Sequence, residues 1–86
     1  MYFVYIIKSR KSGKFYIGCT NNLRRRIEEH NNGLSQATKP YVPWQIMYYE
    51  AYRSGKEAYH RERNLKLRSN ARNQLRARIK ETLNAD

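Results

Sequence analysis

Two residues of one predicted helix, Arg26 and His30, are spaced for chemistry on a phosphate group. They are four residues apart, so a helix over residues 23–30 places them one turn apart on the same side. A guanidinium forms a fork of donors for phosphate oxygens, and an imidazole gains or loses a proton near neutral pH. The alternative is an exposed arginine beside a histidine that the negative end of the helix favours. Both interpretations remain open from these residues alone.

A carboxylate in the second half of the chain interrupts an apolar pattern. Ala58, Glu62 and Leu65 follow the spacing of one helix face, so Glu62 lies on the stripe that its two neighbours would bury. A carboxylate is almost never buried unless it is paired or bound to a metal. Arg26 or another guanidinium could neutralise Glu62, or Glu62 could hold a divalent cation. The pattern favours neither.

Two tyrosines occupy the strands of a predicted hairpin. Residues 2–7 and 15–18 alternate β-branched and aromatic side chains, and the polar stretch between them is typical of a turn. A register that pairs Tyr5 with Tyr16 also pairs Phe3 with Gly18 and places both phenols on one face. A slip of one residue would separate them.

The remaining elements follow from caps and periodicity. Asn22 and its neighbours cap the helix over residues 23–30, residues 34–43 form a loop, and residues 44–52 form a third strand. Ser54 and Glu57 make a capping box that opens a helix to about residue 67. A last helix covers residues 71–83, with an apolar residue at every fourth position. The order β-β-α-β-α-α predicts an α+β domain over residues 1–86, a small antiparallel sheet flanked by helices.

The charge predicts a polyanionic partner. The chain has 86 residues, 18 Lys+Arg against 7 Asp+Glu, and a formal net charge of +11. The basic residues are spread over both halves, which indicates a basic surface that attracts phosphates. Eight tyrosines and one tryptophan add surfaces on which unstacked bases could lie. Nucleic acid is the favoured partner and an anionic membrane surface is the alternative.

Other classes are disfavoured. The single Cys19 and the lack of a secretion signal or an apolar membrane span favour a cytoplasmic protein without disulfides or a membrane partner. One cysteine and two histidines cannot build a closed zinc site, and no Walker or Rossmann glycine loop is present. A thiol enzyme lacks a group to orient its base.

These features together resemble the GIY-YIG nuclease superfamily. Residues 4–6 (Val-Tyr-Ile) stand in the place of the first signature, and residues 16–18 (Tyr-Ile-Gly) reproduce the second. The segment 20–33, with Arg26 and His30, matches the region that comes after the two signatures in that superfamily. Residues 38–39, 43–44 and 57–66 are similar to the small stand-alone UPF0213 or YhbQ-like predicted endonucleases. Phe3 replaces the glycine of the first signature, and the late asparagine of the superfamily has two candidates, Asn70 and Asn73.

The resemblance implies a metal-dependent endonuclease that cleaves DNA phosphodiester bonds, acting on single-stranded or structured DNA in repair or processing. It implies that Tyr5 and Tyr16 are the signature tyrosines, Arg26 the phosphate-binding arginine, His30 the helix residue and Glu62 the ligand of one divalent cation. One carboxylate leaves positions for phosphate and water, which suits Mg²⁺ or Mn²⁺. Further residues expected to contact nucleic acid are Lys14, Arg25, Lys39, Lys66, Arg72, Asn73 and Arg76.

Two other functions remain open. One is a non-catalytic basic module of the same fold that binds nucleic acid, and the other is a protein directed at RNA. No second DNA-binding module is expected, so recognition would rest on backbone charge, stacking and shape. We expect a monomer or a weak homodimer, since a symmetric dimer would supply a second cutting site for a duplex.

Overall fold

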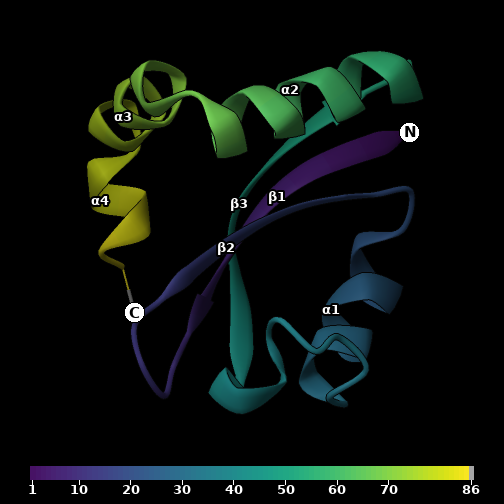
Figure 1. Ribbon diagram of the computed structural model, residues 1–86, viewed down its shortest axis with the longest axis vertical. Coiled ribbons are helices and arrows are strands. Elements are labelled where there is room, and N and C mark those ends of the chain that lie inside the picture. Colours follow the sequence, from purple (N-terminus) through teal and green to yellow (C-terminus); the bar gives the residue numbers. More distant parts are fainter. Residues whose placement is uncertain (86) are drawn as a thin grey trace.

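The computed structural model describes residues 1–85 and confirms the α+β fold. Its sheet is antiparallel in the order β2-β1-β3, with β1 in the centre. The strands are β1 Tyr2–Ser9, β2 Phe15–Thr20 and β3 Trp44–Tyr52. The helices are α1 Leu23–Asn31, the short 3₁₀ helix η1 Lys39–Tyr41, α2 Gly55–Leu67, α3 Ser69–Arg78 and α4 Lys80–Leu83. The ribbon shows α1 on one side of the strands, away from α2, α3 and α4 (Figure 1).

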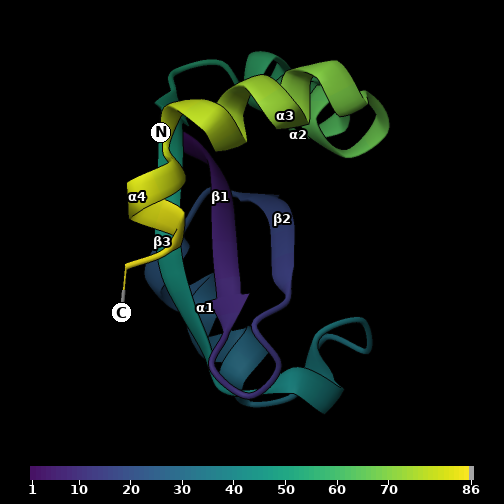
Figure 2. The same ribbon diagram turned by 90° about the vertical axis from the view of Figure 1, so that its left-hand side faces the viewer.

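Two separate cores cover the two faces of the sheet. Val4 and Ile6 of β1 pack with Ala58, Leu65 and further apolar residues of α2, α3 and α4. The alternate residues of β1, Tyr5 and Ile7, point to the opposite face, where Trp44 joins them together with partly buried residues of α1. Strand alternation therefore separates the layer under α2, α3 and α4 from the layer that contains the predicted tyrosines. Figure 2 shows the three strands side by side, with α2 and α3 at the top and α4 beside β3.

The predicted register of the hairpin is wrong by two residues. Tyr5 pairs with Gly18 and Ile7 pairs with Tyr16, so the tyrosines are diagonal neighbours rather than direct partners. A shift of two residues preserves the face on which each side chain lies. The prediction that both phenols share one face is therefore confirmed, and the structure places the small residue Gly18 opposite Tyr5.

The final predicted helix is interrupted. Its apolar stripe is correct, because Leu75 and Leu83 are buried and Ala71 and Ile79 pack against the same core. Ile79 leaves helical geometry, with φ −115° and ψ 29°, and separates α3 from α4. The break turns the chain so that α4 contacts β3 (Figure 2). A single straight helix could not keep both apolar ends on the small sheet.

An ion pair that the sequence did not reveal fastens α2 to the sheet. Arg61 of α2 binds both carboxylate oxygens of Glu50 on β3, at 2.9 and 3.0 Å. The hydroxyls of Tyr48 and Tyr52 donate to the same carboxylate at 2.8 and 2.7 Å. Burial raises the pKa of Tyr52 to about 12, and the hydrogen bonds from Arg61, Tyr52 and Tyr48 outweigh burial and lower the pKa of Glu50. The network fixes the helix at the residue that precedes Glu62.

We expect Glu50→Gln to lower the free energy of unfolding by about 2 kcal/mol, because it leaves the half-buried Arg61 guanidinium without a counter-charge. Urea denaturation measures the change. The matched variant Glu28→Gln alters an exposed glutamate of α1 and should change stability by less than about 0.5 kcal/mol. Equal effects of the two substitutions would contradict the anchoring role of Glu50.

Candidate active site

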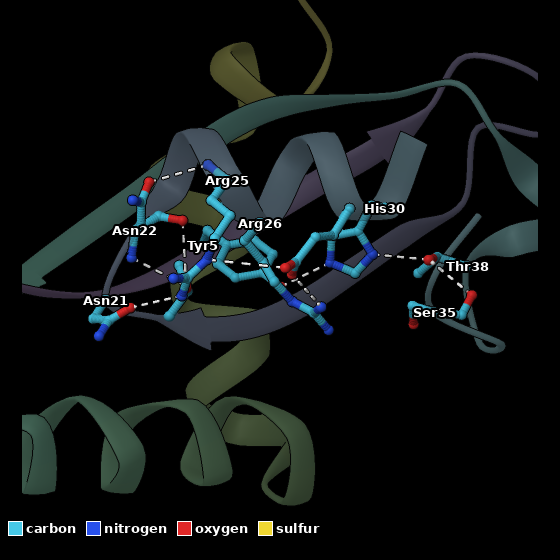
Figure 3. Close-up of polar contacts among 10 residues, drawn as sticks. Tyr5, Asn21, Asn22, Arg25, Arg26, His30, Ser35 and Thr38 are labelled. Atoms are coloured by element: carbon cyan, nitrogen blue, oxygen red, sulfur yellow. Dashed lines mark hydrogen bonds and ion pairs between the residues drawn. The ribbon is translucent and has the colours of Figure 1, made fainter. Parts of the chain in front are cut away.

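His30 lies at the centre of the tyrosine-bearing layer. Its side chain is 0% exposed, and each ring nitrogen has a hydrogen-bond partner. Nε2 lies 2.8 Å from the Tyr5 hydroxyl and Nδ1 lies 2.8 Å from Oγ1 of Thr38. The rings of Tyr5 and Tyr16 both meet the imidazole edge-on, with centroids 5.9 and 5.3 Å away. One imidazole thus contacts both predicted tyrosines, and Figure 3 shows it with Tyr5 and Thr38.

The direction of these hydrogen bonds follows from Thr38. Its hydroxyl donates to the carbonyl of Ser35 at 3.5 Å, so it accepts a hydrogen bond from Nδ1–H of His30. Nε2 is then unprotonated and accepts the hydrogen bond that Tyr5 donates. Burial, assisted by the charge of Arg26, lowers the pKa of His30 to about 4, which keeps the ring neutral near pH 7. The histidine is a fixed acceptor here, and the alternative of a histidine placed only by the helix dipole is wrong.

Trp44 locks the segment that carries Thr38. Its indole N–H donates to the Thr38 carbonyl at 2.9 Å. The side-chain amide of Asn31 binds the Trp44 backbone twice, accepting from its N–H at 2.6 Å and donating to its carbonyl at 3.0 Å. These contacts tie the end of α1, the loop with η1 and the start of β3 into one unit around His30.

Tyr5 is positioned for donation rather than for accepting a proton. The residue is only 2% exposed, and its hydroxyl and ring edge pack on Gly18, where a Cβ atom would collide with them. The second signature therefore needs glycine at this position for a close approach. Burial raises the pKa of Tyr5 to about 12, and the nearby Arg26 guanidinium only partly offsets this effect. Tyr5 remains a phenol that donates to His30.

Tyr16 differs from Tyr5 in its surroundings. It is partly exposed on the edge strand β2, and within residues 1–85 its hydroxyl forms no hydrogen bond. Its ring is fixed on one side by His30 and Trp44, and Nζ of Lys66 lies 5.2 Å from its centroid. The ring is thus held in place while the hydroxyl is free to bind another molecule.

Arg26 is held by a carboxylate of its own helix. Its guanidinium binds Glu29 at 3.0 Å and its side chain is partly exposed. It also lies near the Tyr5 hydroxyl, which together with Glu29 raises the pKa of Arg26 (Figure 3). The structure does not pair Arg26 with Glu62, so the predicted guanidinium partner of that carboxylate is wrong.

The partner of Glu62 is an ammonium group. Nζ of Lys66, one turn along α2, lies 3.2 Å from Oε2 of Glu62, and the glutamate side chain is 16% exposed. The charge of Glu62 contributes to the raised pKa of both Tyr5 and Cys19. Nζ of Lys66 also lies 5.2 Å from the Tyr16 ring centroid, so the ion pair places the Glu62 carboxylate on the side of α2 that is near Tyr16.

The structure disperses the residues expected to contact nucleic acid. Lys14 caps the Tyr41 ring at 4.2 Å, Lys66 belongs to the site, and Arg76 lies over Phe15 at 5.9 Å. Arg72 donates to the carbonyls of Leu65 and Lys66, so it closes the end of α2. The others are Arg25, bound to Asn21 and Glu29, and the exposed Lys39 and Asn73.

Sequence reasoning missed the inner support of the site. Thr38, Trp44 and Asn31 hold His30, and the signal that could have found them is a buried histidine's need for two partners. The Glu50–Arg61 pair could have been suspected because Glu50 interrupts the third strand between two tyrosines. The sequence could not show which loop residue contacts the imidazole, because that depends on the path of residues 34–43.

Comparison with known proteins agrees with the family resemblance of the sequence motifs. The model of the GIY-YIG catalytic domain matches residues 1–76. This chain therefore belongs to the GIY-YIG family, a nuclease superfamily. Its relatives include UPF0213 protein CPE1444 of Clostridium perfringens, 40% identical over 77% of this chain and 71% of that protein. UPF0213 protein SSP2268 of Staphylococcus saprophyticus is 36% identical over 76% of this chain and 79% of its own length. No solved structure gives a significant match.

A metal ion at this site would have one protein carboxylate, Glu62, which Lys66 already contacts at 3.2 Å. GIY-YIG nucleases generally use a divalent metal. Within residues 1–85, no three histidine, cysteine or acidic side chains gather around a point that could hold a metal ion. Glu62 nevertheless offers oxygen atoms that are largely removed from solvent, and phosphate and water would complete the shell. In the same part of the chain, no helix has the length and apolar character needed to cross a membrane.

The buried imidazole predicts an acid-sensitive fold. A histidine with a pKa of about 4 when folded and its ordinary value of 6.5 when unfolded binds more protons in the unfolded state between these values. The free energy of unfolding should therefore fall by about 2 kcal/mol from pH 7.5 to pH 5, measured by urea denaturation at each pH. His30→Gln should remove this part of the slope, and His60→Gln, at an exposed position, should keep it. An unchanged slope in His30→Gln would exclude the histidine as its source.

Proposed function

We propose that this chain is a metal-dependent endonuclease that hydrolyses phosphodiester bonds of DNA. The observation that carries the proposal is the convergence of four elements on one point. Tyr5 of β1 and Tyr16 of β2 meet at His30 of α1, with Arg26 beside Tyr5 and Glu62 of α2 paired with Lys66, whose ammonium lies 5.2 Å from the Tyr16 ring centroid. Residues this far apart in sequence form a partly exposed group of a phenol, a guanidinium and a carboxylate, which is suited to phosphate chemistry.

Arg26 and Lys66 would bind the anionic substrate. A guanidinium binds two phosphate oxygens at once, and Glu29 keeps that of Arg26 oriented while leaving it partly exposed. Lys66 adds a second positive charge beside Tyr16. Both charges would stabilise the negative charge that builds up on the phosphate oxygens as the attacking bond forms. The net charge of +11 would draw the polyanion to this surface.

Tyr16 is the better candidate to direct the attacking water. Its hydroxyl is free, whereas that of Tyr5 is buried and donates to His30. A phenol is a weak base at neutral pH unless neighbouring cations stabilise its phenolate, and the divalent cation would supply that charge. The Tyr16 phenolate, its own proton already lost to solvent, would take the water proton as the water oxygen bonds to phosphorus. The phosphorus–oxygen bond of the leaving group breaks, and the leaving oxygen takes up a proton from solvent. Tyr5 would donate its hydrogen bond to His30 and so keep the part of the site that binds the phosphate, beside Arg26, in a fixed position.

Glu62 would hold the divalent cation, Mg²⁺ or Mn²⁺, which supplies charge neutralisation for the phosphate and the leaving oxygen. The Glu62–Lys66 ion pair also favours a second candidate function, a nucleic-acid-binding module that does not cleave, because it already neutralises the carboxylate. The two functions differ in what happens when the carboxylate is removed.

We expect Glu62→Gln and Tyr16→Phe each to lower cleavage of labelled DNA by at least about 100-fold while binding in chelator changes little. The assay uses single-stranded, duplex and branched DNA and matched RNA, with Mg²⁺, Mn²⁺ or chelator. Glu57→Gln and Tyr59→Phe are the controls, since both residues are exposed on α2. A wild-type chain that binds every substrate and cleaves none would establish the binding module instead.

The role of Arg26 is tested against a neighbouring arginine of the same helix. Arg26→Ala should reduce cleavage by at least about 100-fold, because it removes a charge that contacts the phosphate. Arg24→Ala removes an exposed charge and should cost less than about threefold. Initial rates at equal ionic strength give the comparison, and equal losses would remove Arg26 from the phosphate site.

A further inference from the structure

The sheet face that carries Tyr5 is only partly covered. Helix α1 packs over the end with Ile7 and Ile46, where Leu23 and Ile27 close the layer. Beyond the first turn of α1, Phe3 and Tyr49 continue the same face. Tyr49 is 53% exposed and Ala51, the partner of Phe3, is exposed as well. The uncovered end of the face is thus aromatic.

Phe3 and Tyr49 form a preassembled pair. Their rings meet edge to face with centroids 5.8 Å apart and an interplanar angle of 75°. Such a contact orients both rings, and Tyr49 remains 53% exposed beside the partly exposed Phe3. An exposed apolar surface of this kind commonly marks a binding site. Phe3 stands where the first signature has glycine, so the pair is a departure of this chain from the signature.

The pair adjoins the proposed phosphate site. Tyr49 is the direct cross-strand partner of Tyr5, and directly paired side chains on one face lie about 5 Å apart at Cβ. The exposed Arg53 follows directly after β3. An occupant of this surface would therefore be flat and apolar, and would be attached to an anionic chain that reaches Arg26.

We infer that Phe3 and Tyr49 form a stacking platform for an unpaired nucleobase of the strand whose phosphate lies at the tyrosine site. The inference rests on the proposed function for the position of the phosphate. Base-aromatic stacking needs a base face that is free of its neighbours, and it tolerates any base. The platform thus favours a single-stranded or locally opened segment and does not select sequence.

The test compares a short single-stranded oligonucleotide with a fully abasic chain of the same length and charge. Binding is measured by fluorescence anisotropy in chelator, so that cleavage plays no part. The wild-type chain should bind the intact oligonucleotide at least about fivefold more tightly than the abasic one. Phe3→Leu and Tyr49→Leu should reduce that ratio toward one and leave the affinity for the abasic chain unchanged.

Tyr59→Leu is the matched control, because Tyr59 is an exposed tyrosine of α2 and should keep the wild-type ratio. Tyr49→Ser, at a more exposed position, replaces Phe3→Leu if that variant does not fold. Equal ratios in the wild type and the platform variants would overturn the inference. It would also be overturned if Tyr59→Leu lowered the ratio as much as the platform variants do. A wild-type dimer that Tyr49→Leu converts to a monomer would assign the surface to a second copy. If the platform variants lower the ratio while the wild-type chain cleaves no substrate, the result supports the platform and contradicts only the nuclease proposal.

Discussion

The neutral imidazole of His30 is the contact on which the site depends. It receives a hydrogen bond from Tyr5, donates one to Thr38 and supports the ring of Tyr16. A protonated ring would lose the acceptor that Tyr5 uses and would place a charge in a closed layer beside Arg26. Burial therefore turns a residue that usually exchanges protons into a rigid spacer between two strands and a helix.

The thin sheet explains how a helix on one face can serve a site on the other. Strand β2 is an edge strand, and Gly18 lets the Tyr5 hydroxyl pass close to its backbone. Glu62 and Lys66 of α2 reach the same edge from the opposite layer. The Glu50–Arg61 contact then fixes α2 one residue before the carboxylate. A wider sheet with a strand beyond β2 would separate the two layers.

The order and type of the elements could be predicted from sequence, because caps and periodicity are local properties. The shared face of Tyr5 and Tyr16 was predictable even though the register was not, since strand alternation survives a shift of two residues. The break at Ile79 was not predictable, because the size of the sheet demands it. The partners of His30 depended on long-range packing, whereas the partner of Glu62 is Lys66, four residues along its own helix, which the sequence spacing could have revealed.

The close approach of Tyr5 to Gly18 has a consequence for the newly made chain. The two hydroxyls come from β1 and β2, the imidazole and the guanidinium come from α1, and the carboxylate comes from α2. These four segments meet only after the hairpin is in register and β3 and α2 have joined it. The site is therefore assembled only once the sheet and the two helices that carry its residues have packed together.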